Sequence, residues 1–257
     1  MALGKFDALH RGHQKLAIKA VHLGGTPYLI SFAGMADVLG WEPRLPLVAQ
    51  EDRSRVLYSW KHVCLGAVPR EHRMPFGSIR NLSPEEFVAL LAVNLGVKGV
   101  VVGSNYRFGY KAAGTARTLK MLGAEYGMNV DVVNLLENSQ NITHGIGDVV
   151  SSSKIREALR QGDMKLVEQC MGRGYRLVAR ADSQKLKENK EIEYSGCLNQ
   201  YPTNGEYDVA VWIVKDVADV DGDGFLTRLV FSESGIHLGD MAVLDDLYGD
   251  VYCVIQF

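Results

Sequence analysis

The spacing of hydrophobic and polar positions divides the chain into two parts. In the first two-thirds, apolar runs typical of strands alternate with segments that favour helices. The runs 97–102 and 130–135 are continuously apolar, as in strands buried on both faces of a parallel sheet. The alternation predicts an α/β domain with a parallel sheet covered on both faces. The predicted strands are 28–32, 97–102 and 130–135, and the predicted helices are 52–60, 84–94, 119–126 and 154–160.

The start of the predicted helix 84–94 carries the strongest local signal. Ser83 is a good N-cap, Pro84 suits the first helical position, and Glu86 completes a capping box. We therefore expect the helix to begin at Pro84.

The pattern changes after about residue 174. Short β-like runs are separated by turn residues such as those at 202–205, which predicts a small all-β domain. We therefore expect an α/β domain over residues 1–174 and a β domain over 175–257. The charged stretch 185–193 is expected to be a solvated loop. The β-like runs are 176–180, 207–214, 227–231 and 251–257.

Composition narrows the functional classes. The 257 residues are 47% hydrophobic, enough for two modest cores, and no apolar run reaches the length of a membrane span. A net charge of −2 argues against a general nucleic-acid-binding surface. The four cysteines are scattered without a CxxC pair, which argues against structural zinc or a disulfide framework and fits a reducing compartment. No targeting segment is recognisable, and the short stretch before Lys5 fits a mature or trimmed form.

Two histidines stand three residues apart where a short strand is expected to turn into a helix. They are His10 and His13, with Gly12 between them. A helix start offers N–H groups and the positive end of the dipole, and Gly12 allows a ligand close to the backbone. With two imidazoles added, this predicts a cradle for a polyphosphate. The alternative is a pair of surface histidines on an ordinary helix.

A second phosphate-binding corner is predicted where three serines precede the helix 154–160. Hydroxyls of Ser151 and Ser152 stand at a helix start, followed by Lys154 and Arg156. An arginine can hold phosphate oxygens bidentately, and a lysine supplies a point charge. The alternative is a serine cap with exposed basic residues.

Two further segments are candidates for binding a ligand. The stretch 103–109 directly follows a buried strand, and its aromatic and amide side chains suit a planar ring. The alternative is an ordinary turn with packed aromatics. The stretch 219–224 looks like the start of a calcium-binding EF-hand loop, but Val230 stands where that loop needs glutamate. We therefore interpret 219–224 as an acidic hairpin turn.

The motifs in their order resemble a known family. The pattern at His10–His13 is that of the HxGH nucleotidylyltransferases. Together with 103–109 and 151–156 it resembles the FMN adenylyltransferase module of the prokaryotic-type FAD synthetases over residues 1–174. The stretch 34–44 looks like that of the plastid enzymes of plants and green algae. Lys5, Ser104 and Ser153 depart from the family pattern, which has asparagine, an acidic residue and threonine there.

The resemblance implies a Rossmann-like nucleotidylyltransferase that transfers AMP from ATP to FMN, with Mg²⁺, releasing FAD and pyrophosphate. It implies small-molecule partners only, with neither nucleic acid nor membrane, and a plastid location; the alternative location is the cytoplasm. Sequence leaves the oligomeric state open. The implied catalytic residues are His10, His13 and Arg156. The implied ATP-binding residues are Gly4, Phe6, Asp7, His10, Gly12, His13, Ser151, Ser152, Lys154 and Arg156. The implied flavin-binding residues are Phe32, Asn105, Tyr106, Arg107 and Thr115, and no protein ligand of a metal is expected.

The predicted β domain resembles in part the riboflavin kinase barrel of the bifunctional family members. The kinase PTAN motif does not follow Arg176, and Gly235 stands where the resemblance places the glutamate base. We therefore expect a degenerate barrel without kinase activity. The alternatives are a bifunctional enzyme, a nicotinate- or phosphopantetheine-type adenylyltransferase, and a non-catalytic flavin- or nucleotide-binding protein of the same fold.

Overall fold

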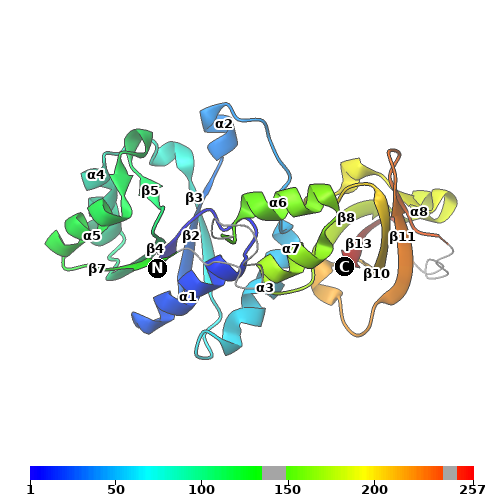
Figure 1. Ribbon diagram of the computed structural model, residues 1–257, viewed down its shortest axis with the longest axis horizontal. Coiled ribbons are helices and arrows are strands. Elements are labelled where there is room, and N and C mark those ends of the chain that lie inside the picture. Colours follow the sequence, from blue (N-terminus) through cyan, green and yellow to red (C-terminus); the bar gives the residue numbers. More distant parts are fainter. Residues whose placement is uncertain (135–148, 240–247) are drawn as a thin grey trace, which may run out of the picture. The chain divides into compact units, whose positions relative to one another are not determined.

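The computed structural model describes residues 1–134, 149–239 and 248–257 (Figure 1). The chain divides into two compact units. Unit 1 comprises Met1–Pro43 and Val56–Val150, and unit 2 comprises Arg44–Arg55 and Ser151–Phe257. The predicted division into domains 1–174 and 175–257 is based on sequence patterns and stays a prediction.

Unit 1 contains a parallel five-stranded sheet, which confirms the predicted α/β class. Its strand order is β3-β2-β1-β4-β7, so β1 is central, between β2 and β4. The strands are β1 Ala2–Leu3, β2 Tyr28–Ala33, β3 Arg70–Pro75, β4 Gly99–Gly103 and β7 Asn129–Val133. A separate ladder pairs β5 Arg107–Phe108 with β6 Gly114–Thr115. The helices of this part of the chain are α1 Arg11–His22, α2 Met35–Leu39, α3 Arg53–Ser59, α4 Pro84–Ala89, which continues as a π-helix over Leu90–Asn94, and α5 Ala116–Glu125.

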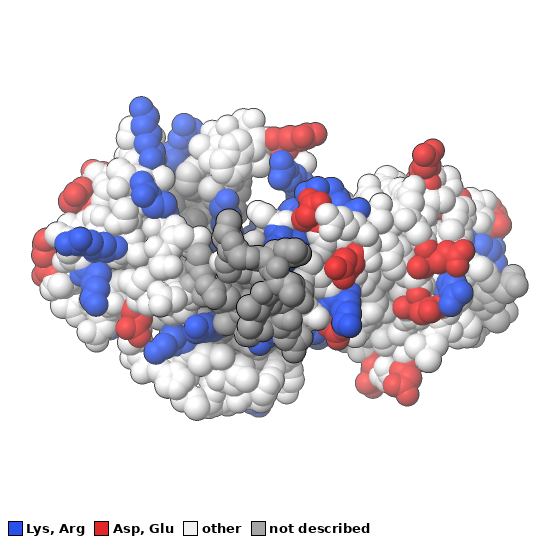
Figure 2. All heavy atoms as spheres, in the orientation of Figure 1, with Lys and Arg blue, Asp and Glu red and all other residues white. Residues whose placement is uncertain are grey.

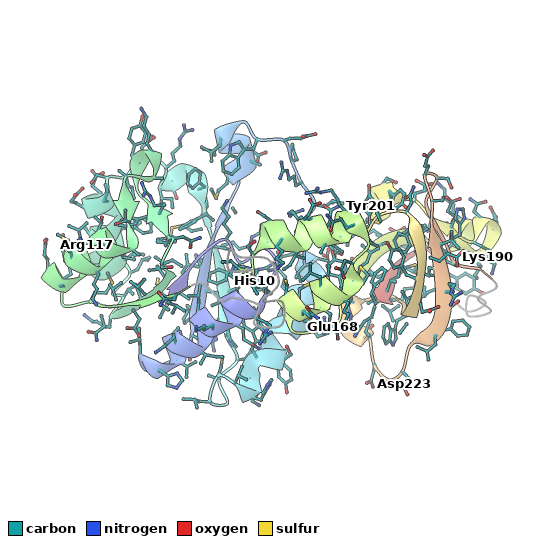
Figure 3. The ribbon with its side chains drawn as sticks, viewed as in Figure 1. His10, Arg117, Glu168, Lys190, Tyr201 and Asp223 are labelled. Carbon is teal, nitrogen blue, oxygen red and sulfur yellow. The ribbon has the colours of Figure 1, made fainter. Side chains whose placement is uncertain are left out.

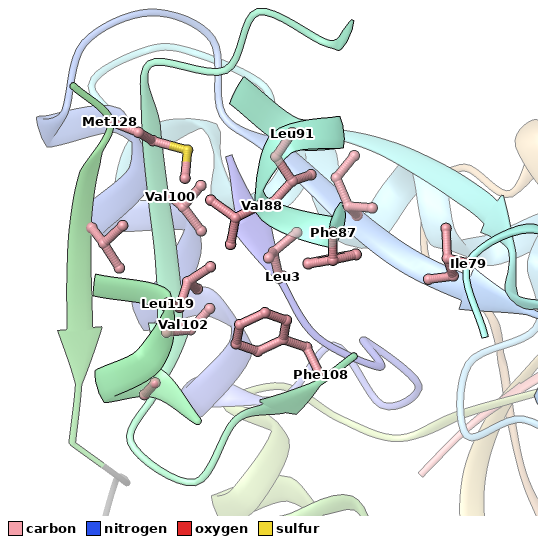
Figure 4. Close-up of a cluster of buried hydrophobic side chains, with 13 residues drawn as sticks. Leu3, Ile79, Phe87, Val88, Leu91, Val100, Val102, Phe108, Leu119 and Met128 are labelled. Carbon is pink, nitrogen blue, oxygen red and sulfur yellow. The ribbon is translucent and has the colours of Figure 1, made fainter. Parts of the chain in front are cut away.

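The core of unit 1 shows why the apolar runs become buried strands. Val100 and Val102 of β4 face α4 and α5, where Phe87 and Leu119 pack against them in one buried cluster (Figure 4). Alternate strand residues point to opposite faces, so Val101 faces the other side, and α1 contacts β4 and its neighbours. Helices on both faces leave the strand ends as the place for a ligand.

Unit 2 contains the antiparallel barrel that the β-like runs predict. The six strands form a nearly closed sheet in the order β8-β13-β10-β11-β12-β9, and a bridge from Ala179 to Cys197 adds to it. The strands are β8 Arg176–Asp182, β9 Glu191–Ile192, β10 Gly205–Val214, β11 Phe225–Phe231, β12 Ile236–His237 and β13 Asp250–Gln256. The helices are α6 Ser152–Gln161, α7 Met164–Met171 and α8 Ser183–Asn189.

The expectation of a solvated loop at 185–193 is wrong. This stretch forms most of α8 and all of β9. The Asp182 side chain caps α8 by accepting N–H bonds from Gln184 and Lys185, and Leu186 is fully buried. The cap and the burial of Leu186 both help to hold this charged helix against the barrel. Of the predicted strand 130–135, Leu135 lies outside the described residues.

Charged side chains of both signs lie on the surface of the protein. On the face drawn in Figure 2, basic and acidic side chains are scattered in small groups between uncharged areas. Among the described residues, no helix is both long enough and apolar enough to cross a bilayer.

The buried thiols predict a pH dependence of stability. Burial raises the pKa of Cys197 and Cys253 to about 12, against an ordinary value of 9.0. Above the ordinary value the unfolded chain releases thiol protons that the folded protein retains, so the free energy of unfolding falls as pH rises toward 12. We expect the urea midpoint of Cys253→Val to fall less steeply between pH 8 and 10 than that of the wild type. Equal slopes for the two proteins contradict the assignment.

Candidate active site

The loop between β1 and α1 lies at the switch point of the sheet. From β1 the chain passes to β2 and β3 on one side and later returns to β4 on the other. In open α/β sheets, ligands bind beyond the carboxyl ends of the strands at such a point. Residues 4–10 form this loop, directly after the central strand. The predicted position of the histidine motif is therefore confirmed.

The loop holds an unusual backbone shape. Phe6 and Leu9 have φ values of 47° and 46°, a region that residues other than glycine rarely adopt, and both side chains are completely buried. Gly4 accommodates the Phe6 ring, because a Cβ at Gly4 would lie 3.3 Å from its tip. Burial of two apolar side chains in this way holds the strained loop in one conformation.

The two histidines form a stacked pair at the helix start, where Figure 3 labels His10. His10 is the N-cap of α1, and its Nδ1 accepts the backbone N–H of His13 at 3.3 Å. Their rings stack with centroids 3.7 Å apart and planes 12° from parallel, and the Phe6 ring lies 5.0 Å from that of His13. Because Nδ1 accepts, a neutral His10 carries its proton on Nε2 and can donate it.

The helix start that carries these histidines favours an anion. The first turn of α1 holds no acidic residue. Its backbone N–H groups and dipole therefore act without opposition from a carboxylate in that turn. A donor ring, a positive helix end and a rigid loop together suit the charged oxygens of a polyphosphate.

The second predicted phosphate corner is at the start of α6, in unit 2. Ser151 is the N-cap of this helix, and its Oγ accepts the Lys154 N–H at 3.2 Å. Arg156 donates to Gln200 Oε1 at 3.1 Å and to the Leu45 carbonyl at 2.9 Å. The first turn of α6 also lacks acidic residues. The serine cap is thus real, and it is compatible with an anion at the same helix end.

The residues predicted to bind the flavin all lie in unit 1. Some of them are exposed, and others take part in a helix cap or in the core. Asn105 and Arg107 are exposed, and Arg107 Nε donates to the Ala112 carbonyl at 3.0 Å. Thr115 caps α5 by accepting the Thr118 N–H at 3.2 Å. The Phe32 ring lies 6.4 Å from Phe87 in the core. Their role in flavin binding stays a prediction.

Tyr106 has a buried hydroxyl. Its ring stacks near Phe108 with centroids 6.0 Å apart, and its phenol oxygen has no hydrogen-bond partner among the described residues. Burial raises the pKa of Tyr106 well above its usual range, so the side chain stays neutral. A neutral buried phenol can donate to a ligand that reaches it.

The barrel holds a polar cluster that no sequence pattern indicated. His237 Nε2 lies 2.9 Å from Ser232 Oγ and 4.0 Å from Glu191 Oε1. Gly235 is packed against β9, and a Cβ there would lie 2.7 Å from the Ile192 carbonyl oxygen. A side chain at position 235 would therefore displace backbone. This packing makes the site unsuitable for a glutamate at that position.

The described residues contain no group of three or more His, Cys, Asp and Glu side chains able to hold a metal ion.

The acidic stretch 219–224 lies in the connection between β10 and β11, which pair as an antiparallel hairpin. The stretch therefore lies in a hairpin connection, as interpreted, but this connection spans 215–224 and contains the short 3-10 helix Val217–Asp219, so it is a long loop and not a tight turn.

A parallel sheet whose central strand leads into a His-x-Gly-His helix start defines the chain as a nucleotidylyltransferase-type α/β protein with a β-barrel unit. Comparison with known families refines this class. The sequence model of FAD synthetase matches residues 1–145, and the chain belongs to the FAD synthetase family.

Similar proteins agree with this assignment. FAD synthetase 2, chloroplastic, of Arabidopsis thaliana is 42% identical over 247 residues, which cover 93% of this chain and 66% of the relative. FAD synthetase 1, chloroplastic, is also 42% identical, and the match covers 84% of this chain and 64% of that protein. A bifunctional riboflavin kinase/FMN adenylyltransferase of Pseudomonas fluorescens is 28% identical over 87% of this chain and 69% of its own length. The chain thus spans less than two-thirds of the two plant proteins.

Among solved structures, one similar fold is the crystal structure of a protein described as a macrolide-efflux protein from Streptococcus pneumoniae. The TM-score is 0.70 at 21% identity, and the match covers 99% of this chain and 84% of that one. This likeness supports the two-part fold and carries no inference about activity.

Proposed function

We propose that the protein is an FMN adenylyltransferase that makes FAD from ATP and FMN. A phosphate oxygen of FMN attacks the α-phosphorus of ATP, a new P–O bond forms, and the bond to the β-phosphate breaks to release pyrophosphate. The observation that supports this most directly is the stacked His10–His13 pair on a rigid loop at the end of the central strand. Family membership and the two plant relatives support the choice of substrates.

Each motif has a proposed role in this reaction. His10 and His13 bind the triphosphate and stabilise the charge that builds up at the α-phosphorus. Ser151, Ser152, Lys154 and Arg156 hold the departing pyrophosphate, Gly4, Phe6, Asp7 and Gly12 shape the nucleotide site, and Asn105 with its neighbours holds the flavin. Positioning and charge stabilisation dominate because no covalent intermediate on the protein is required.

Mg²⁺ fits this site as part of the substrate. Mg²⁺ is commonly bound through phosphate oxygens with only one or two carboxylates. The loop 4–10 offers one carboxylate, Asp7, and the described residues hold no group of three or more His, Cys, Asp and Glu side chains able to bind a metal ion. Mg²⁺ bound to ATP would neutralise part of the phosphate charge.

We also propose that the barrel lacks riboflavin kinase activity and that the protein works in the plastid. The closed packing around Gly235 supports the first statement. The chloroplastic plant relatives support the second.

Product chromatography tests the proposed function. The protein is incubated with Mg-ATP and either FMN or riboflavin. We expect FAD and pyrophosphate from FMN and no FMN from riboflavin. FMN formed from riboflavin contradicts the inactive barrel, and no FAD from FMN contradicts the main proposal.

Gly12→Ala tests the shape of the histidine site. A Cβ at Gly12 would lie 3.0 Å from Cε1 and 3.1 Å from Nδ1 of His10, so the imidazole must shift by a few tenths of an ångström. We expect kcat for FAD formation to fall about tenfold, because preorganised donors lose strength when displaced. The urea midpoint should stay equal or rise, since alanine favours a helix more than glycine. Unchanged kcat means that the position of the His10 ring is unimportant.

A further inference from the structure

A lysine and a tryptophan pair beside the phosphate loop of unit 1. The Lys5 ammonium lies over the Trp41 indole, 5.4 Å from the ring centroid. Lys5 is exposed and follows Gly4 directly, so it belongs to the same loop that leads to His10. Trp41 is 51% exposed, unusually high for an indole without a partner molecule. The pair therefore lies at the surface of the proposed nucleotide site.

Few contacts hold the segment that carries Trp41. It directly follows α2, none of whose residues is buried, and which projects from the sheet near β3 (Figure 1). Glycines in the left-handed conformation, Gly34 and Gly40, flank α2 on both sides. The backbone N–H of Trp41 donates to the Ala36 carbonyl at 2.9 Å, and the Arg80 side chain donates to the Val38 carbonyl at 3.4 Å. A segment with so little buried surface can shift at low cost.

The charges around the loop favour a change of partner for Lys5. An exposed cation–π contact is weak, whereas a lysine paired with phosphate oxygens gains a charge-assisted hydrogen bond. The first turn of α1 carries no acidic residue. Asp7 is the one carboxylate in the loop 4–10. A triphosphate at this helix start would therefore compete successfully with the indole for the ammonium group.

We propose that Lys5 is a triphosphate-binding residue that exchanges its contact with the Trp41 ring for the phosphates of ATP when ATP binds. This inference rests on the proposed function and adds to it a residue that departs from the family pattern, which has asparagine at this position. Lys5 positions the triphosphate and leaves the bond-making step to the groups around His10. Trp41 holds the cation close by and reports its departure.

Steady-state kinetics separate this role from a structural one. We expect Lys5→Met to raise KM for ATP roughly tenfold, as for loss of one charge-assisted bond, with kcat and KM for FMN little changed. Lys5→Arg should recover most of the affinity because it keeps the charge. The matched control is Lys61→Met, since Lys61 lies over Tyr58 at 5.7 Å in the same kind of exposed pair. It should leave both KM values unchanged.

Tryptophan emission gives an independent readout. Mg-ATP added without FMN should change the emission of the wild type, and this change should be absent in Trp41→Phe, which keeps the buried Trp60 and the partly buried Trp212. AMP, which lacks the β- and γ-phosphates, should produce little change. Lys5→Met should remove the change even at saturating ATP.

The outcomes distinguish this inference from the proposed function. If the wild type makes FAD but Lys5→Met keeps the wild-type KM for ATP, or keeps the emission change, the inference about Lys5 is overturned and the function stands. A rise in KM for FMN alone also overturns it. If the wild type makes no FAD, calorimetric titration of Mg-ATP into wild type and Lys5→Met tests the inference separately, and equal affinities or no binding overturn it.

Discussion

Replacing His10 with asparagine is expected to lower kcat for FAD formation by about 10²–10³-fold, the usual cost of removing one preorganised donor. The substitution separates two functions of one side chain. The Nδ1 of His10 caps α1 by accepting the His13 N–H, and the His10 ring stacks on that of His13. Asparagine is a strong N-cap, so the helix start should persist while the imidazole is lost.

His10→Ala completes the comparison. It removes the cap as well, so the free energy of unfolding should fall by about 1 kcal/mol relative to His10→Asn, with a similar loss of kcat. The control is His22→Asn in the last turn of the same helix, where the exposed ring lies with Nδ1 2.7 Å from the Ile18 carbonyl oxygen. Wild-type kcat in a folded His10→Asn protein contradicts the proposed role. Equal stability of the two His10 variants contradicts the capping role.

Sequence predicted best where a local signal and the tertiary environment agree. The capping box at Ser83 forms as expected, with bonds of 3.1 Å from the Glu86 N–H to Ser83 Oγ and 2.7 Å from the Ser83 N–H to Glu86 Oε2. The apolar run near Val100 is a buried strand because helices cover both of its faces. The histidine spacing correctly placed both rings at one helix start.

Elements held mainly by tertiary contacts were missed. β3 is a largely exposed edge strand with the sequence REHRMP, and it is ordered by parallel pairing with β2 rather than by apolar residues of its own. The positive φ values of Phe6 and Leu9 also have no sequence signal, since both residues usually avoid that region. Both side chains are completely buried in unit 1, and this burial helps to hold them there. The rigid shape of the candidate site therefore depends on packing that periodicity does not encode.

The buried ion cluster of unit 2 is a second feature without a sequence signal, and removal of one of its charges should strongly destabilise the fold. Asp52 is 2% exposed and accepts two bonds from Arg55, at 2.6 and 2.7 Å. Arg176, whose side chain is 8% exposed, lies 3.4 Å from the same carboxylate and 5.3 Å over the Trp212 ring. Burial lowers the pKa of Arg176, chiefly by desolvation and then by the nearby Arg55. Among the described residues, Asp52 is the anionic partner of Arg176, and without this carboxylate the buried cation would keep only the neutral Gln256 as an acceptor.

We therefore expect Asp52→Ala to lower the free energy of unfolding by about 3–5 kcal/mol, as for a buried charge deprived of its partner. Urea unfolding followed by tryptophan emission measures this loss. Arg55→Ala is the matched control: its side chain is 39% exposed, and Asp52 keeps Arg176, so a smaller loss is expected. In the double variant Asp52→Leu with Arg176→Leu, part of the stability should return, because neither charge of that pair remains buried. Two results would mean that the carboxylate does not neutralise Arg176. One is a loss below about 1 kcal/mol in Asp52→Ala, and the other is a double variant that is less stable than Asp52→Leu alone.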